Sequence, residues 1–121
     1  MIATSLVNRR IFVVEDEMLI AIQLEEILES LGCVVVGPVS KLEVAVRMAG
    51  EEQIDAAILD ITIRGGQVFP AAEVLLGRDI PFVFASGYSD WALPDPFRGK
   101  PQLQKPFSPE DLAKALREIS A

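Results

Sequence analysis

The feature that most constrains this chain is the alternation of short apolar runs with longer amphipathic segments. The apolar runs are rich in β-branched and aromatic residues and predict buried strands over residues 11–14, 33–39, 54–59, 81–85 and 101–104. Between them, apolar residues recur at helical spacing and predict helices over residues 17–31, 40–50, 70–76 and 108–119. Strands that alternate with helices indicate an α/β fold, with a parallel sheet covered by helices on both faces.

Local signals place the ends of these elements. Ser40 with Glu43, and Ser108 with Asp111, form two capping boxes that predict helix starts. The second box also carries Pro109 at the first helical position. Glycines are expected to end or interrupt elements: Gly32 after the first helix, Gly65 and Gly66 in a loop, and Gly77 after the third helix. Gly37 and Pro38 weaken the second strand, which we expect at an edge of the sheet.

Length and composition fit one domain. The chain has 121 residues, half of them hydrophobic, which predicts one domain over residues 1–121 and no output domain. No apolar run approaches the roughly 20 residues that span a bilayer. A lone cysteine, Cys33, offers no internal disulfide. We therefore expect a soluble, cytoplasmic protein without a membrane partner.

Charge and the absence of histidine exclude several functions. The formal charge of −7 argues against nucleic acid as a partner, because its binding requires clustered lysine and arginine. The chain has no histidine, which excludes histidine-based catalysis, most zinc sites and a phosphohistidine-carrier role. The available chemistry is that of carboxylates, hydroxyls and lysine.

Polar residues follow four of the predicted strands. Glu15 and Asp16 follow the first strand, Asp60 the third, Ser86 the fourth and Lys105 the fifth. In an open parallel sheet the carboxyl ends of the strands meet at one edge, where ligands bind. Each residue alone is explained more simply as a turn former, a helix cap or a solvated end. Their joint occurrence at matching strand ends predicts one site.

The charges of this site favour a bound cation. Three carboxylates in proximity raise one another's pKa unless a positive charge intervenes. Lys105 supplies one positive charge and could balance the cluster alone, but Mg²⁺ also suits a few carboxylates and a carbonyl, and it leaves coordination positions open. Asp55 is a control: it begins the third strand, so it lies about 17 Å from Asp60 at about 3.3 Å per residue and belongs to the opposite edge.

These residues resemble those of a known family. The pair Glu15-Asp16, then Asp60, Ser86, and Lys105 before Pro106 and Phe107, are similar in kind and order to the receiver domain of two-component response regulators. The resemblance covers essentially the whole chain. It implies a flavodoxin-like, doubly wound sheet of five parallel strands in the order 2-1-3-4-5, with helices on both faces.

The resemblance also implies roles. Asp60 would accept a phosphoryl group, Lys105 would pair with that group, and the hydroxyl of Ser86 would move toward it. The implied Mg²⁺ ligands are Glu15, Asp16, Asp60 and the backbone carbonyl of Thr62. The Lys105–Pro106 peptide bond is expected to be cis, which proline makes accessible. The phosphoryl donor would be a histidine on another protein.

Residues 81–88 are similar to the receiver subgroup marked by Phe-Ala-Thr-Gly-Tyr, found mainly in alphaproteobacteria, with Ser86 in place of the threonine. That similarity suggests a sensor histidine kinase of the HWE or a related type. The chain departs from the family at Gln102, where most receivers have an aromatic residue, and it lacks the usual proline in the loop after Asp60. We therefore expect signalling to use residues 86–99, with Tyr88 and Trp91 repacking.

The resulting hypothesis is a stand-alone response regulator, a switch rather than a metabolic enzyme. It would take phosphate from a kinase and change the binding of an unknown downstream protein, or relay or drain the phosphate. The alternative is a receiver-like interaction module that is not phosphorylated. A haloacid-dehalogenase-type phosphatase would need an aspartate at Thr62, and flavin binding would need a Ser/Thr/Gly-rich phosphate loop after the first strand, which is absent.

Overall fold

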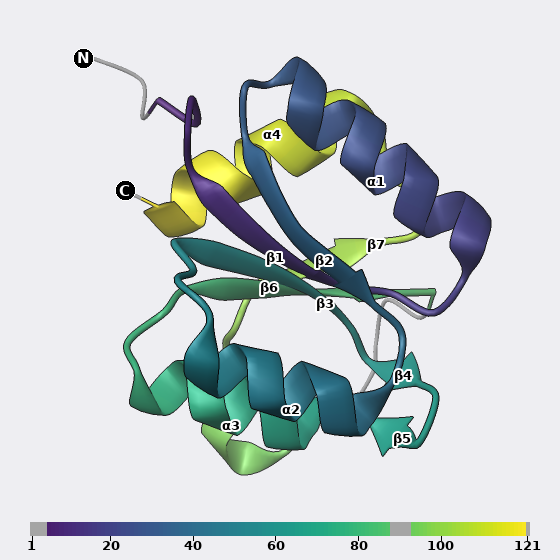
Figure 1. The fold of residues 1–121 in the computed structure, drawn as a ribbon, viewed down its shortest axis with the longest axis vertical. Helices are drawn as coiled ribbons and strands as arrows, with labels where there is room; N and C mark the ends of the chain where they lie inside the picture. Colours follow the sequence, from purple (N-terminus) through teal and green to yellow (C-terminus); the bar gives the residue numbers. More distant parts are fainter. Residues whose placement is uncertain (1–4, 88–92, 121) are drawn as a thin grey trace.

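The centre of the molecule is a sheet of five parallel strands (Figure 1). We describe residues 5–87 and 93–120 of a computed structural model. The strands are β1 (Arg10–Val14), β2 (Val34–Val39), β3 (Ala56–Asp60), β6 (Phe82–Ser86) and β7 (Gln102–Gln104). They lie in the order β2-β1-β3-β6-β7. Counted by these five strands alone, the order is 2-1-3-4-5, which confirms the predicted fold.

Two pairs of helices cover the two faces of the sheet. The helices are α1 (Met18–Ser30), α2 (Leu42–Glu51), α3 (Phe69–Gly77) and α4 (Pro109–Ser120). Figure 1 shows α1 and α4 on one face, and α2 and α3 on the other. Side chains alternate along β1: Phe12 and Val14 pack in the core under α2 and α3, whereas Ile11 and Val13 pack under α1 and α4. The doubly covered sheet explains why its central strands are continuous apolar runs.

The edge strands differ from the central ones. Every residue of β3 and β6 is buried, whereas in β2 only Val36 and Val39 are buried, as expected for an edge. The pairing of β1 with β2 shifts register between Phe12 and Val14. Opposite this shift, Gly37 has a φ of +101°, and a Cβ there would lie 2.9 Å from the carbonyl oxygen of Val13. Gly37 thus lets the edge strand bend against β1.

Of the two predicted capping boxes, one is confirmed. The N–H of Ser108 donates to Asp111 Oδ2 (3.2 Å), and the N–H of Asp111 donates to Ser108 Oγ (3.0 Å), at the start of α4. The box at Ser40 is wrong, since Lys41 is the N-cap of α2 and no side chain caps it. The backbone of Ser40 instead accepts a hydrogen bond from the N–H of Arg64 (3.2 Å). This long-range pairing moves the helix start by one residue.

We expect Ser108→Ala to lower the free energy of unfolding by about 1 kcal/mol, because the substitution removes the cap of α4. Ser40→Ala is the matched control and should change stability by less than about 0.5 kcal/mol, since the Ser40 side chain caps no helix. Urea unfolding of both variants measures the difference. Equal effects of the two substitutions would contradict the assignment of the caps.

Glycines act partly as predicted. Gly32 follows α1 with a φ of +84°, as expected. The predicted loop is confirmed at Gly65 (φ +97°), which lies in the turn between two short antiparallel strands, β4 (Thr62–Ile63) and β5 (Gly66–Gln67). It is wrong at Gly66 (φ +137°), which begins β5 and pairs with Ile63. Gly77 does not stop α3, since it is the last helical residue and Asp79 takes the left-handed conformation (φ +57°). Asparagine and aspartate tolerate that conformation.

The segment before β7 is held by one aromatic residue. The 3₁₀ turn η1 (Asp95–Phe97) buries Phe97, whose ring lies 5.5 Å from that of Phe69 and 5.6 Å from that of Phe84.

Gln102 is exposed on β7. Tyr88 and Trp91, which we expected to repack, lie outside the described residues. Within the described residues, no helix has the length and hydrophobicity of a membrane span.

Candidate functional site

The structure brings the polar residues of the strand ends together. Asp60 and Ser86 are the last residues of β3 and β6, while Glu15 and Lys105 directly follow β1 and β7. Lys105 Nζ lies 2.7 Å from Glu15 Oε1 and 3.4 Å from Asp60 Oδ2. Carboxylate oxygens of Glu15, Asp16 and Asp60 all lie within 4.8 Å of one another. The four segments therefore meet as the sequence predicted.

Backbone pairing fixes where these side chains stand. The N–H of Glu15 donates to the carbonyl of Val39 (2.9 Å), and the N–H of Lys105 donates to the carbonyl of Ser86 (2.7 Å). Asp60 is paired with Ala85 across β3 and β6. Each functional residue is thus placed by a rigid strand end, and the site does not depend on the order of a long loop.

Beside this cluster is a hollow of about 640 Å³. It is lined by Asp16, Glu17, Asp60, Ile61, Thr62, Ser86, Gly87 and Lys105. Asp60 is 8% exposed and Ser86 is 4% exposed, so the hollow gives limited access to both side chains. Thr62, in β4, is exposed at its rim. Sequence reasoning missed Glu17, whose N–H donates to Glu15 Oε2 (3.1 Å); the run of three acids at residues 15–17 was the available signal.

Glu15 is the most deeply buried charge of the site, at 2% exposed. The Lys105 ammonium and the Glu17 N–H both bind its carboxylate. The resemblance assigned Lys105 to the phosphoryl group, and without that group Lys105 contacts two carboxylates. A buried carboxylate without such partners is costly, so Glu15 and Lys105 also hold each other in place.

Lys105 offsets only part of the rise that burial and Glu15 cause in the pKa of Asp60. Burial, and then Glu15, raise the pKa of Asp60 to about 7, although Lys105 acts in the opposite direction. Burial lowers the pKa of Lys105, but its hydrogen bond to Glu15 and the charges of Asp60 and Glu15 outweigh burial and raise it. Three carboxylates thus face one ammonium. A hard divalent cation fits this donor set, and Glu15, Asp16 and Asp60 are the residues that would hold it.

Asp55 serves as the control, and the structure places it away from this cluster. It precedes β3, at the opposite end of the strand from Asp60, and its Oδ2 accepts the N–H of Arg10 (2.8 Å). An acidic residue beside a strand is therefore not enough to define the site. The end of the strand decides which acids converge.

Comparison with known proteins gives the family. The response regulator receiver domain model matches residues 11–117. The chain belongs to this family. The Lys105–Pro106 bond of this receiver domain is cis, as the resemblance implied. The recognition made from Glu15-Asp16, Asp60, Ser86 and Lys105 is confirmed at the level of the family.

Relatives of this receiver domain include regulators of different length. It is 32% identical to the transcriptional regulatory protein PdtaR of Mycobacterium tuberculosis, over 98% of this chain and 63% of PdtaR. The chain thus spans less than two thirds of that relative. The structure of this receiver domain matches the solution structure of SdrG from Sphingomonas melonis Fr1 with a TM-score of 0.82 and 46% identity. The match covers 98% of this chain and 100% of the SdrG chain. A second SdrG structure is described as the BeF₃-activated conformation.

A third comparison concerns the metal. The receiver domain of sensor histidine kinase PA1611 from Pseudomonas aeruginosa PAO1 matches with a TM-score of 0.79 and 23% identity, over 94% of this chain and 98% of that one. Its structure has a magnesium ion in the active-site cleft. Receiver domains bind Mg²⁺ at an acidic site, and this receiver domain has such an acidic cluster at Glu15, Asp16 and Asp60.

Proposed function

We propose that this chain is a phosphorylation switch, in which Asp60 accepts a phosphoryl group from a sensor histidine kinase in a Mg²⁺-dependent reaction. One observation carries the proposal. The Asp60 carboxylate is nearly buried, lies 3.4 Å from the Lys105 ammonium, belongs to a cluster of three acids and borders a hollow open to solvent. The switch is a signalling device located in the cytoplasm rather than a metabolic enzyme.

The chemistry follows from the positions of the side chains. A carboxylate oxygen of Asp60 attacks phosphorus in line, the acyl–phosphate O–P bond forms, and the P–N bond to the donor imidazole breaks with its electron pair left on nitrogen. Lys105 offsets the charge on the phosphoryl oxygens. Mg²⁺, held by Glu15, Asp16, Asp60 and the carbonyl of Thr62, would supply further neutralisation when bound. Because burial raises the pKa of Asp60 to about 7, a cation held there would also favour the ionised form of the nucleophile.

Ser86 would couple phosphorylation of Asp60 to a change of conformation. This buried hydroxyl lines the same hollow as Asp60 and would donate a hydrogen bond to the phosphoryl group. SdrG, 46% identical to this chain, has been described in a BeF₃-activated conformation. By analogy, phosphorylation would select a second conformation here and change the binding of a downstream protein, or the phosphate would be relayed or drained.

An unphosphorylated interaction module is the alternative. It would retain the fold and the acidic patch but would take up no phosphoryl group from any donor. Intact-mass analysis with acetyl phosphate and Mg²⁺ separates the two functions, since our proposal expects uptake by the wild type and none by Asp60→Asn. The complete set Glu15, Asp16, Asp60, Ser86 and Lys105 favours the switch.

Exposed apolar side chains at the start of α1, which directly follows Glu17 of the hollow, suit a protein donor. Met18, Leu19 and Ile22 lie on one side of α1 and are 76%, 83% and 45% exposed. Next to α1, a hollow of about 370 Å³ is lined in part by Ile20, Lys105 and Phe107. Large apolar side chains exposed together mark a protein contact. A kinase helix docked on this patch would present its phosphohistidine near Asp60.

We expect Leu19→Glu to slow phosphotransfer from a kinase at least about tenfold, because the substitution places a charge in an apolar contact. Labelling by acetyl phosphate should stay unchanged, since that donor needs no docking surface. The kinase is the one that labels the wild type fastest in a phosphotransfer profile of the source organism. Val34→Glu, a matched change at another exposed apolar residue, is the control. Equal slowing with both donors would contradict the docking role.

A further inference from the structure

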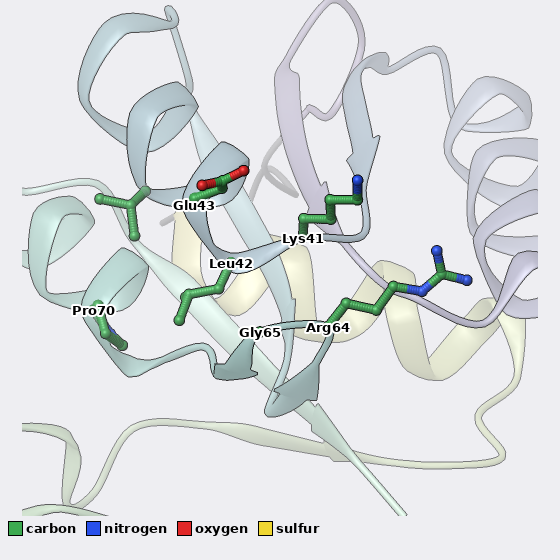
Figure 2. A pocket seen from close by; sticks show the side chains of 7 residues that line it. Lys41, Leu42, Glu43, Arg64, Gly65 and Pro70 are labelled. Atoms are coloured by element: carbon green, nitrogen blue, oxygen red, sulfur yellow. The ribbon is translucent and has the colours of Figure 1, made fainter.

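A second hollow, of about 590 Å³, shares no lining residue with the hollow of the candidate site. It is formed by the start of α2, the β4–β5 hairpin and the start of α3 (Figure 2). Its lining has three apolar residues, two cationic residues, one acid and one glycine: Leu42, Val46, Pro70, Lys41, Arg64, Glu43 and Gly65. None of the acids of the candidate site lines this hollow.

Backbone contacts hold its walls together. The N–H of Leu42 donates to the carbonyl of Arg64 (2.8 Å), and Lys41 and Arg64 form an isolated parallel bridge. Gly65 has a φ of +97°, and a Cβ at this position would come within 3.3 Å of Leu42 Cβ. The hairpin thus packs closely on the first residue of α2, and the hollow is formed before any ligand arrives.

The two cations of the hollow, Lys41 and Arg64, are not paired with acids among the described residues. Lys41 and Arg64 are exposed, and neither takes part in an ion pair within residues 5–87 and 93–120. Figure 2 shows both side chains extending to the same side of the hollow, away from Leu42 and Pro70. The carboxylate of Glu43 lies apart from the Arg64 guanidinium. An apolar floor therefore adjoins a positive edge, on a chain whose net charge is −7.

We propose that this hollow binds an acidic segment of a partner protein. An aliphatic side chain would sit against Leu42, Val46 and Pro70, and nearby carboxylates would pair with Lys41 and Arg64. The apolar residues and the cations of the hollow lie side by side. In an extended segment, the side chains of residues i and i+2 point the same way, so one can contact the apolar residues while the other pairs with a cation. The negative charge of the partner complements the exposed, unpaired cations Lys41 and Arg64. The inference does not depend on phosphorylation of Asp60.

The test is an NMR titration of the full ¹⁵N-labelled chain with three synthetic peptides of equal length. One carries a leucine followed by three aspartates, one has serine in place of the leucine, and one has lysines in place of the aspartates. We expect the first peptide to shift the amide signals of Leu42, Val46, Arg64 and Gly65, with a Kd of about 1 mM or tighter that weakens as salt is added. The other two peptides should bind at least about tenfold more weakly.

Two double variants of equal charge locate the binding. Lys41→Glu/Arg64→Glu should raise the Kd of the leucine–aspartate peptide at least about tenfold, since both ion pairs become repulsive. Lys114→Glu/Arg117→Glu changes two exposed cations of α4, on the other face of the sheet from the hollow, and should alter the Kd about twofold at most, because distant surface charges are screened. Spectra of the free variants should match that of the wild type outside the substituted positions if both are folded.

Several results would overturn the proposal. Equal affinity for the lysine peptide would remove the charge preference, and equal Kd values for the two double variants would place binding elsewhere. Hexanoate that binds as tightly as the peptide would make the hollow a site for small carboxylates. Shifts of the same signals when the free protein is concentrated would make it an interface between two copies of the chain.

Discussion

Lys105→Ala is expected to lower the free energy of unfolding by about 3 kcal/mol at about pH 8 without Mg²⁺. The substitution removes the Lys105 ammonium that pairs with two buried carboxylates. In the wild type, Lys105 Nζ contacts Glu15 Oε1 at 2.7 Å and Asp60 Oδ2 at 3.4 Å. Glu15 is only 2% exposed. In the alanine variant, the Glu17 N–H is the one hydrogen-bond donor to its carboxylate that remains within the described residues. Chemical denaturation measures the loss.

The free energy of unfolding of the same variant should depend on pH more steeply than that of the wild type. Asp60 already has a pKa raised to about 7 in the folded protein, above the ordinary value of 3.8, so folding takes up a proton between these values. Stability therefore falls as the pH rises from about 4 to 7, and removal of Lys105 extends this fall to higher pH. We expect the variant to recover part of its loss at about pH 6, where a proton replaces the missing cation.

Lys114→Ala is the matched control. Lys114 is exposed on α4 and belongs to no ion pair within residues 5–87 and 93–120. Its removal should change stability by less than about 0.5 kcal/mol at either pH. If Lys105→Ala lost no more stability than Lys114→Ala, or lost the same amount at both pH values, the electrostatic account of the cluster would be wrong.

Asp16→Asn is expected to weaken Mg²⁺ binding at least about tenfold, because a hard cation loses an anionic oxygen ligand. Mg²⁺ is expected to bind the cluster only in the folded protein, so it should raise the melting temperature of the wild type by mass action. The variant should remain folded and need at least about ten times more MgCl₂ for the same rise. A series of melting curves against MgCl₂ concentration measures the shift.

Asp55→Asn provides the control for the metal. This residue is also an aspartate beside a strand, but it lies at the opposite end of β3, bonded to the N–H of Arg10. Its substitution should leave the response to MgCl₂ unchanged, whatever it does to stability. A response of Asp16→Asn identical to that of the wild type would place the ion elsewhere.

The sequence predicted the strands well because the sheet buries both of its faces. Residues 11–14 and 81–85 are apolar throughout, and helices cover β1 and β6 on either side. The same reasoning predicted the site, since a polar residue directly after such a run must stand at the carboxyl edge. Asp60 and Lys105 were placed in this way, although they are 45 residues apart in the sequence.

The failures came from contacts between distant segments. Ser40 carries a capping signal, but its backbone pairs with Arg64, and the helix begins after Lys41. Local signals cannot report such a pairing, nor the hollow that it creates beside Leu42. Likewise, convergence predicted that Lys105 would meet acids, but not that Glu15 would be its shortest contact. That preference depends on the burial of Glu15, which only the packed structure shows.

The most direct test of the account is the intact mass of the protein after incubation with acetyl phosphate. With Mg²⁺, the wild type should gain one phosphoryl group, and addition of EDTA in excess of Mg²⁺ should prevent the gain. Asp60→Asn should gain none, while Asp55→Asn should gain the group as the wild type does. Labelling of Asp60→Asn to the wild-type level, or labelling that persists in EDTA, would contradict the assignment of Asp60 as the Mg²⁺-dependent phosphoryl acceptor.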